Sequence, residues 1–285
     1  MRAVAVTVAA AALLVAAAQG AAPPRLAGTI AFARSGAGHG IWLVRPDGSN
    51  LRRIANVGGA YGLAWSEDGT RLLFGRSGGG GSGIWIVNRD GSGLVHVSGG
   101  SQPTWAPGGR IAWVVNFRGA CIRSENLDGT DKRDVYCTGS GPLALVQRPQ
   151  WSPDRTRLAW LEPNPDEARP SGTFTIADQI RVGGADGAGA TAVPLDGSIR
   201  DFHWSPNGTQ FVYKVVRGRT YDGVWIARVD GGAPRRLRLN ATSPAWSPDG
   251  RHTVALWDDG LFTMDTSGGH VVRIPGTTDA DDGPA

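Results

Sequence analysis

The chain has 285 residues, of which 41% are hydrophobic and 19% are charged, and it contains 43 Gly, 18 Pro and 11 Trp. This length suits one all-β domain, and the hydrophobic fraction is high enough for a packed core, which excludes a disordered or collagen-like chain. The formal net charge is only +4, from 29 basic and 25 acidic residues scattered along the sequence, and this excludes nucleic acid as the main partner.

The first predicted element is an export signal at residues 1–20. Arg2 precedes an apolar run from Ala3 to Ala18, and small residues follow where a signal peptidase would cut. A membrane anchor is the alternative interpretation, but the run is short and weakly apolar for a span. We therefore expect a periplasmic or secreted protein that has no membrane span after cleavage of the signal.

A five-residue phrase then recurs along the chain. Its full form is Trp-Ser-Pro-Asp-Gly at 246–250, and related forms begin at Trp65, Trp105, Trp151 and Trp204, at intervals of 40, 46, 53 and 42 residues. Periods near forty residues with four strands each are typical of propeller blades. We expect the Trp to end an inner strand and to wedge between blades, while Pro and Asp-Gly complete a tight turn. A carbohydrate-stacking platform is the alternative role for the five Trp.

Each complete repeat predicts four antiparallel strands. Five such blades are expected, at 61–98, 101–140, 147–196, 200–240 and 242–276. Before them, residues 28–33, 41–44 and 51–54 supply three strands of a first blade. Either residues 21–27 add its inner strand loosely, or the first blade is three-stranded. The prediction is an all-β, six-bladed β-propeller over residues 27–276, with five or seven blades as alternatives, followed by a disordered acidic tail at 277–285.

Asp-Gly pairs mark the outer hairpins of the predicted blades. Gly adopts positive φ without a Cβ penalty, and Asp supports the turn with its side chain. Calcium binding is the alternative interpretation, but each turn offers only one or two oxygens, whereas calcium needs several in one loop. We therefore expect no metal site and no cofactor.

The two cysteines flank one of these turns. Cys121 and Cys137 lie eight residues to either side of Gly129. In an antiparallel hairpin this symmetry places them opposite each other, and a disulfide suits an exported protein. A pair of free thiols or a metal-binding pair is the alternative.

The repeat resembles that of the TolB-like β-propeller family, whose blades are WD-repeat-like. The segments Pro244–Gly250 and Ile41–Gly48 fit its pattern well, and the resemblance covers about residues 27–276. It implies a six-bladed propeller, exported to the periplasm or the cell surface, that binds other proteins. Only a few residues separate the signal from the first strand, so we do not expect the α/β domain that precedes the propeller in the family's namesake, and a Tol-Pal role is not implied.

Strand direction places the long loops on the rim opposite the Trp-Ser-Pro-Asp-Gly corners. Surface loops on a rigid scaffold are where binding usually resides. A tolerated insertion without a partner is the alternative. The candidate binding residues in these loops are Glu162, Asp166, Glu167, Arg169, Arg217, Arg219 and Tyr221.

Polar residues of the inner strands are expected around the mouth of the channel. They are Tyr61, Gln102, Arg148, Gln150, Arg200, Asp201 and His203. A single His with one nearby Asp lacks the three or four ligands that a metal needs, so we expect His203 to be a hydrogen-bonded channel residue. Nucleophile-elbow, zinc-protease and phosphate-loop motifs are missing from the sequence.

The sequence therefore predicts a monomeric, non-enzymatic scaffold that binds a protein or another partner in the cell envelope. The alternative is a lyase or hydrolase that acts at the channel mouth through His203, Asp201 and Arg148 or Arg200.

Overall fold

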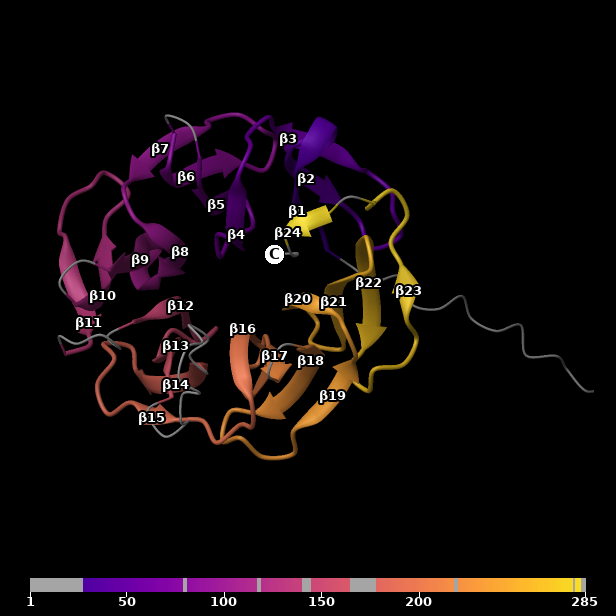
Figure 1. Ribbon diagram of the computed structural model, residues 1–285. Coiled ribbons are helices and arrows are strands. Elements are labelled where there is room, and N and C mark those ends of the chain that lie inside the picture. The colour runs from indigo at the N-terminus through magenta and orange to yellow at the C-terminus, as the bar shows by residue number, and fades with distance from the viewer. Residues whose placement is uncertain are drawn as a thin grey trace, which may run out of the picture.

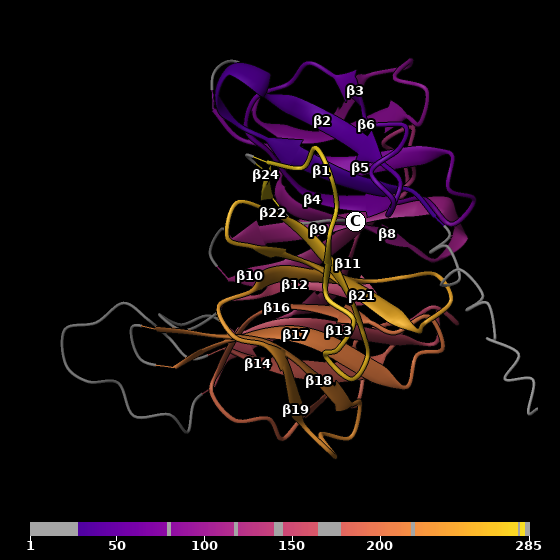
Figure 2. The same cartoon turned by 90° about the vertical axis from the view of Figure 1, so that its right-hand side faces the viewer.

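Six four-stranded antiparallel sheets surround a central axis in the computed structural model (Figure 1). It describes residues 28–78, 81–116, 119–139, 145–164, 178–217, 220–278 and 280–282. The predicted six-bladed β-propeller is thus confirmed, whereas the predicted signal at residues 1–20 lies outside the described residues. The view turned by 90° shows the blades from the side (Figure 2). Among the described residues no helix is both long and apolar enough to cross a membrane.

Blades 2 to 6 are each built from four strands that follow one another in the chain. In blade 2 these are β4 (Ala60–Trp65), β5 (Arg71–Arg76), β6 (Gly83–Asn88) and β7 (Val95–Ser98). In blade 3 they are β8 (Ser101–Ala106), β9 (Arg110–Asn116), β10 (Ala120–Glu125) and β11 (Arg133–Cys137). In blade 4 they are β12 (Gln147–Trp151), β13 (Arg157–Pro163), β14 (Asp178–Gly184) and β15 (Thr191–Ala192).

Blades 5 and 6 continue this order. Blade 5 contains β16 (Ser198–Trp204), β17 (Gln210–Arg217), β18 (Thr220–Arg228) and β19 (Arg235–Arg238). Blade 6 contains β20 (Thr242–Trp246), β21 (His252–Trp257), β22 (Gly260–Asp265) and β23 (Val272–Arg273). Two short 3-10 turns, η1 (Gly36–Gly38) and η2 (Pro107–Gly109), complete the described elements.

The first blade combines strands from the two ends of the chain. Strands β1 (Ile30–Arg34), β2 (Gly40–Val44) and β3 (Arg52–Ala55) are consecutive, and β24 (Ala280–Asp282) pairs antiparallel with β1. The expectation of a disordered tail over 277–285 is therefore wrong for residues 280–282. Pairing the last strand with the first closes the ring and covers an edge of β1. The segment is short and acidic, without alternating apolar residues, so its sequence did not indicate a strand.

The Trp-Ser-Pro-Asp-Gly phrase forms a hydrogen-bonded turn between the first two strands of a blade. In blade 2, Ser66 Oγ donates to Asp68 Oδ1 (2.6 Å), and Thr70 N donates to the same oxygen (3.0 Å). Gly69 follows at φ 64°. These hydrogen bonds lower the pKa of Asp68 to about 2, and the bond from Ser66 has the largest effect. The phrase is therefore a structural corner whose carboxylate holds the turn closed.

The tryptophans of the phrase connect adjacent blades. Three indole N–H groups donate to a backbone carbonyl oxygen in the inner strand of the preceding blade: Trp105 to Ala64 (3.0 Å), Trp204 to Gln150 (3.2 Å) and Trp246 to His203 (3.2 Å). Trp151 instead donates to the Ala185 carbonyl oxygen in its own blade (3.0 Å). The hydrophobic core lies between the sheets, where buried residues of blade 1 pack against Leu72 and Phe74 of blade 2.

A disulfide joins the two outer strands of blade 3. Cys121 on β10 lies directly opposite Cys137 on β11, with their Cα atoms 4.1 Å apart, which confirms the predicted pairing. Among the described residues, one group of three potential metal ligands lies close together, and it consists of these two cysteines and Asp134. Both of its sulfurs are joined in the disulfide.

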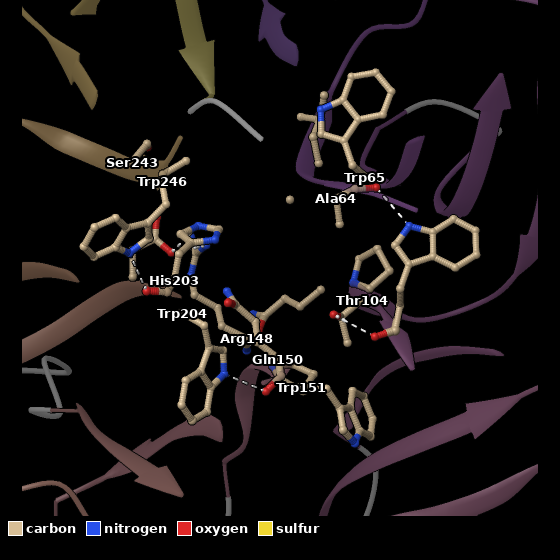
Figure 3. A pocket seen from close by; sticks show the side chains of 18 of the residues that line it. Ala64, Trp65, Thr104, Arg148, Gln150, Trp151, His203, Trp204, Ser243 and Trp246 are labelled. Carbon is tan, nitrogen blue, oxygen red and sulfur yellow. Dashed lines mark hydrogen bonds and ion pairs between the residues drawn. The ribbon is translucent and has the colours of Figure 1, made fainter. Parts of the chain in front are cut away.

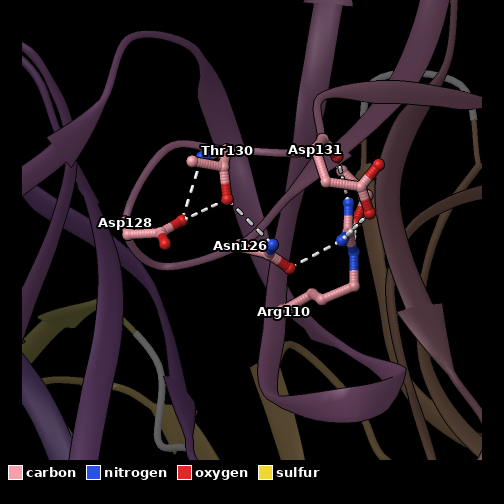
Figure 4. Close-up of polar contacts among 6 residues, drawn as sticks. Arg110, Asn126, Asp128, Thr130 and Asp131 are labelled. Carbon is pink, nitrogen blue, oxygen red and sulfur yellow. Dashed lines mark hydrogen bonds and ion pairs between the residues drawn. The ribbon is translucent and has the colours of Figure 1, made fainter.

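Blade 3 also contains a buried arginine that secures its Asp-Gly turn (Figure 4). The Arg110 guanidinium donates to Ser124 Oγ (3.0 Å), Asn126 Oδ1 (2.7 Å), and both the carboxylate and the carbonyl oxygen of Asp131 (2.5 Å each). The turn continues this network, since Thr130 donates to Asp128 Oδ1 and accepts from Asn126. Arg110 thus fastens β9 to the loop between β10 and β11.

Candidate functional site: the central channel

The inner strands of blades 2 to 6 share one irregularity that aims side chains into the channel. In each, the register against the second strand shifts shortly before the Trp of the repeated phrase. In four blades a residue within this bulge has positive φ: Gly62 (59°), Gln102 (51°), Arg148 (49°) and Ser243 (48°). A bulge changes the direction of a side chain, and bulges are over-represented beside functional sites.

Two rings of residues from these strands line a cavity of about 640 Å³ in the channel (Figure 3). One ring is formed at the bulges by Gly62, Gln102, Arg148, Asp201 and Ser243. The other lies one residue before each Trp and consists of Ala64, Thr104, Gln150, His203 and Ala245. In these two rings the larger polar side chains come from blades 3, 4 and 5, whereas blades 2 and 6 contribute small residues, although Tyr61 of blade 2 also lines the cavity. The rings therefore have a polar side and a side of small residues, which we call the open side.

The polar side is connected by hydrogen bonds between neighbouring blades. Gln102 Oε1 accepts from the Arg148 backbone N–H (2.6 Å), and Arg148 Nη1 donates to Asp201 Oδ1 (2.9 Å). Gln150 Nε2 donates to the Phe202 carbonyl oxygen (2.7 Å). His203 Nε2 lies 3.8 Å from Asp201 Oδ1. These contacts hold the side chains of blades 3 to 5 in fixed positions around the cavity.

Burial shifts the pKa of several ionisable groups in blades 4 and 5. It lowers the pKa of His203, while Asp201 acts in the opposite direction, so the imidazole is neutral at pH 7. It also lowers the pKa of Lys214, which lies opposite Asp201 where β16 and β17 are paired. Burial raises the pKa of Asp178 to about 6, against the effect of the Arg200 guanidinium 3.0 Å away.

Six of the seven residues predicted for the channel mouth line the cavity. They are Tyr61, Gln102, Arg148, Gln150, Asp201 and His203. Burial raises the pKa of Tyr61, with a smaller opposite effect from a hydrogen bond to the backbone of Gln102. Arg200 is not among the lining residues, since its guanidinium binds Asp178 on β14.

Four polar residues that line the cavity were not predicted from the sequence: Thr104, Arg155, Ser243 and Ser247. Thr104 and Ser243 occupy the same repeat positions as His203 and Arg148, so aligning the repeats on their Trp could have found them. Arg155 stands where the other complete corners have Gly, and this substitution in the phrase was its signal.

Arg155 reaches from blade 4 toward blades 3 and 2 at the corner end of the channel. Its φ is 63°, close to the values of Gly69, Gly208 and Gly250 at the equivalent position. Nη1 lies 3.5 Å from the Trp105 carbonyl oxygen, and Nη2 lies 3.6 Å from a carboxylate oxygen of Glu67. Nε is buried without a hydrogen-bond partner among the described residues.

The loop residues predicted to bind a partner are not brought to the channel by the described structure. Glu162 Oε1 accepts from the Tyr136 hydroxyl (2.6 Å) and from Trp160 Nε1 (2.7 Å), between blades 3 and 4. Arg217 pairs with Asp222 (2.8 Å). Tyr221 belongs to β18, but its side chain is outside the described part. Asp166, Glu167, Arg169 and Arg219 lie outside the described residues.

The comparison with known sequences gives one partial relative and no family. No family model matches the chain. It is 30% identical over 124 residues, or 40% of its length, to a protein named "Uncharacterized peptidase YuxL" from Bacillus subtilis (strain 168). The chain spans only 18% of the length of that relative.

Solved structures resemble the chain much more extensively. TolB from Acinetobacter baumannii has a TM-score of 0.72 and 17% identity, covering 92% of this chain and 67% of that one. A putative TolB from Agrobacterium tumefaciens has a TM-score of 0.63 and 17% identity, covering 90% and 92%. An oligogalacturonate lyase in complex with manganese has a TM-score of 0.51 and 14% identity, covering 82% and 70%. At these identities the likeness is one of fold, and the chain is a six-bladed propeller whose structural neighbours include TolB-like propellers and enzymes.

Proposed function

We propose that the chain is an exported, non-enzymatic propeller that binds a protein or another partner of the cell envelope at the mouth of its channel. One observation carries this proposal. Among the described residues, ten that are not Gly have positive φ, and four of them, Gln102, Arg148, Arg155 and Ser243, line the cavity. Such conformations are unfavourable for residues with a Cβ, and they cluster at functional sites where the surrounding structure enforces them.

The chemistry of the cavity favours binding over catalysis. Asp201 is held by Arg148, and His203 lies 3.8 Å from that same carboxylate. The lining offers several fixed donors and acceptors on one side and open space on the other, which suits recognition of a group that enters from solvent.

Two observations support export. The Cys121–Cys137 disulfide suits an oxidising compartment, and solved TolB structures share the fold. Mass analysis of the chain recovered from the envelope or the medium tests this part, with loss of residues 1–20 as the expected result. Recovery of the intact chain in the cytoplasm would contradict it.

Filling the open side of the channel tests where the partner binds. A Cβ added at Gly62 would have nothing within 4 Å, and the same bulge carries Gln102 and Arg148 in other blades. We therefore expect Gly62→Tyr to fold and to reduce the partner crosslinked to the full chain in envelope extracts by about tenfold. Gly129→Tyr is the matched control, since Gly129 also has positive φ and open space but lies in an outer turn. Equal crosslinking in the two variants would contradict the proposal.

A hydrolase or lyase at the same site is the second candidate. It is favoured by the neutral His203 beside Asp201 and Arg148, and a manganese-bound lyase is among the structural neighbours. Metal analysis of the purified chain and loss of any detected activity in His203→Ala test this candidate. A stoichiometric metal together with that loss would replace the binding proposal.

A further inference from the structure

Arg155 breaks the repeat at a position where the backbone favours Gly. At the equivalent corners Gly69, Gly208 and Gly250 have φ of 64°, 66° and 68°, and Arg155 has nearly the same φ of 63°. Only Gly adopts this conformation without strain. Blade 4 therefore retains a long cationic side chain at the corner end of the channel although its local structure is better suited to Gly.

The guanidinium of Arg155 is poorly satisfied within the described structure. Its Nε is buried without a hydrogen-bond partner, and its two remaining contacts, to the Trp105 carbonyl oxygen and to Glu67, are 3.5 Å and 3.6 Å long. The Glu67 side chain is 84% exposed, so the ion pair is screened by solvent. A planar guanidinium whose hydrogen bonds are this weak can turn toward a carboxylate, whose two oxygens match its paired N–H groups.

A second cationic centre, Arg148, lies near the start of β12, the inner strand that leads into the turn of Arg155. Arg148 is 40% exposed and faces the cavity, and its partner Asp201 also interacts with Lys214, which in turn interacts with Arg200. One nitrogen of Arg148 binds Asp201, and the rest of its partly exposed guanidinium faces the cavity. Its remaining N–H groups can donate to the carboxylate of a ligand at this end.

We infer that the channel is a binding site for a small, elongated dicarboxylate, with one carboxylate on Arg155 and the other on Arg148. The cavity of about 640 Å³ has the size of a small-molecule site. Three extended residues of β12 and then a tight turn separate the two arginines, which corresponds to roughly 10 Å of strand between Arg148 and the turn that carries Arg155. The middle of the bound ligand then lies beside Gln150 and His203. This inference goes beyond the proposed binding of a partner at the channel mouth, and its test does not use that partner.

The test is a calorimetric titration of the full chain with straight-chain α,ω-dicarboxylates, from succinate to dodecanedioate. Affinity should peak at one intermediate length. At that length the dicarboxylate should bind at least about tenfold more tightly than the monocarboxylate or the diamide. Affinity that is independent of length, or equal for the diamide, would overturn the inference, even if Gly62→Tyr releases the partner as proposed above.

Substituting each arginine in turn tests whether it binds one of the two carboxylates of the ligand. Arg155→Gly should weaken the best dicarboxylate at least about tenfold and abolish its advantage over the monocarboxylate. Arg148→Gln should do the same from the other end. Arg155→Gly restores the residue of the other corners, so it should melt no lower than the wild type, and a loss of affinity cannot be attributed to unfolding.

The matched control is Ala233→Gly. Ala233 is an exposed residue with φ 50° that lies far along the chain from the channel strands of blade 4. The substitution Ala233→Gly relieves the same kind of backbone strain as Arg155→Gly without removing a cation, so dicarboxylate binding should be unchanged. Unchanged binding in Arg155→Gly as well would overturn the assignment of Arg155.

Discussion

Arg110 and Arg155 lie at the corner ends of neighbouring blades, but the structure satisfies them very differently. Arg110 makes four hydrogen bonds of 3.0 Å or less within blade 3, and its side chain is only 9% exposed. Arg155 has positive φ, a buried Nε without a partner among the described residues, and two long contacts to other blades. The comparison separates an arginine that stabilises the fold from one that the fold merely tolerates.

The largest effect at neutral pH is expected from Arg110→Ala. This change leaves Ser124, Asn126 and the Asp131 carboxylate without their shared donor, in a network that is buried at Arg110 and Ser124 and exposed at Asp131. Loss of Arg110 from this partly buried network should lower the free energy of unfolding by about 2 kcal/mol. Urea unfolding measures this change. A decrease smaller than about 1 kcal/mol would mean that the network does not stabilise blade 3.

The Asp178–Arg200 pair should produce an effect that depends on pH. Burial raises the pKa of Asp178 to about 6, above its usual 3.8, so the folded state binds a proton that the unfolded state releases. The contribution of this group to stability is therefore gained as pH falls from about 6 toward 4, and it reaches about 2 kcal/mol after allowance for partial solvation of the pair.

The measurement is the free energy of unfolding as a function of pH, and Asp178→Asn is its reference variant. Burial lowers the pKa of His203, which makes the protein less stable as pH falls below 6.5, and this opposite trend is present in both proteins. Subtracting the variant's unfolding curve from that of the wild type isolates Asp178. A difference that is constant between pH 7 and pH 4 would contradict the assignment.

Arg155→Gly should have the smallest effect on stability, and in the opposite direction from Arg110→Ala. Relief of the strain at φ 63° is partly offset by the greater freedom of Gly in the unfolded chain, so we expect a gain of about 0.5–1 kcal/mol. Chemical denaturation beside the Ala233→Gly control measures it. A loss of more than about 1 kcal/mol would mean that Arg155, like Arg110, is a structural residue.

The sequence predicted most of the ring because its signals are local. The spacing of the five Trp gave blades 2 to 6, and the symmetry of Cys121 and Cys137 about Gly129 gave the disulfide. The closing strand β24 was missed because its pairing with β1 joins residues from opposite ends of the chain. Its short acidic sequence carries no periodic pattern of its own.

The channel was harder to predict because bulges decide which side chains face it. Arg200 and Asp201 are consecutive, and consecutive residues of a strand point to opposite faces, so both could not line the cavity. The register shift between Ile199 and Asp201 turns the Asp201 side chain toward the cavity, whereas Arg200 donates a hydrogen bond to Asp178. Arg155 was missed because a turn phrase does not show where the side chain of its last residue points.

The central claim is that side chains held in strained conformations line the channel because they bind a ligand. The most direct measurement is a crystal structure of the full chain with the dicarboxylate of optimal length. We predict one carboxylate within hydrogen-bond distance of the Arg155 guanidinium and the other within hydrogen-bond distance of the Arg148 guanidinium. A ligand bound outside the channel, with the contacts of Arg155 to Trp105 and Glu67 unchanged, would contradict the account.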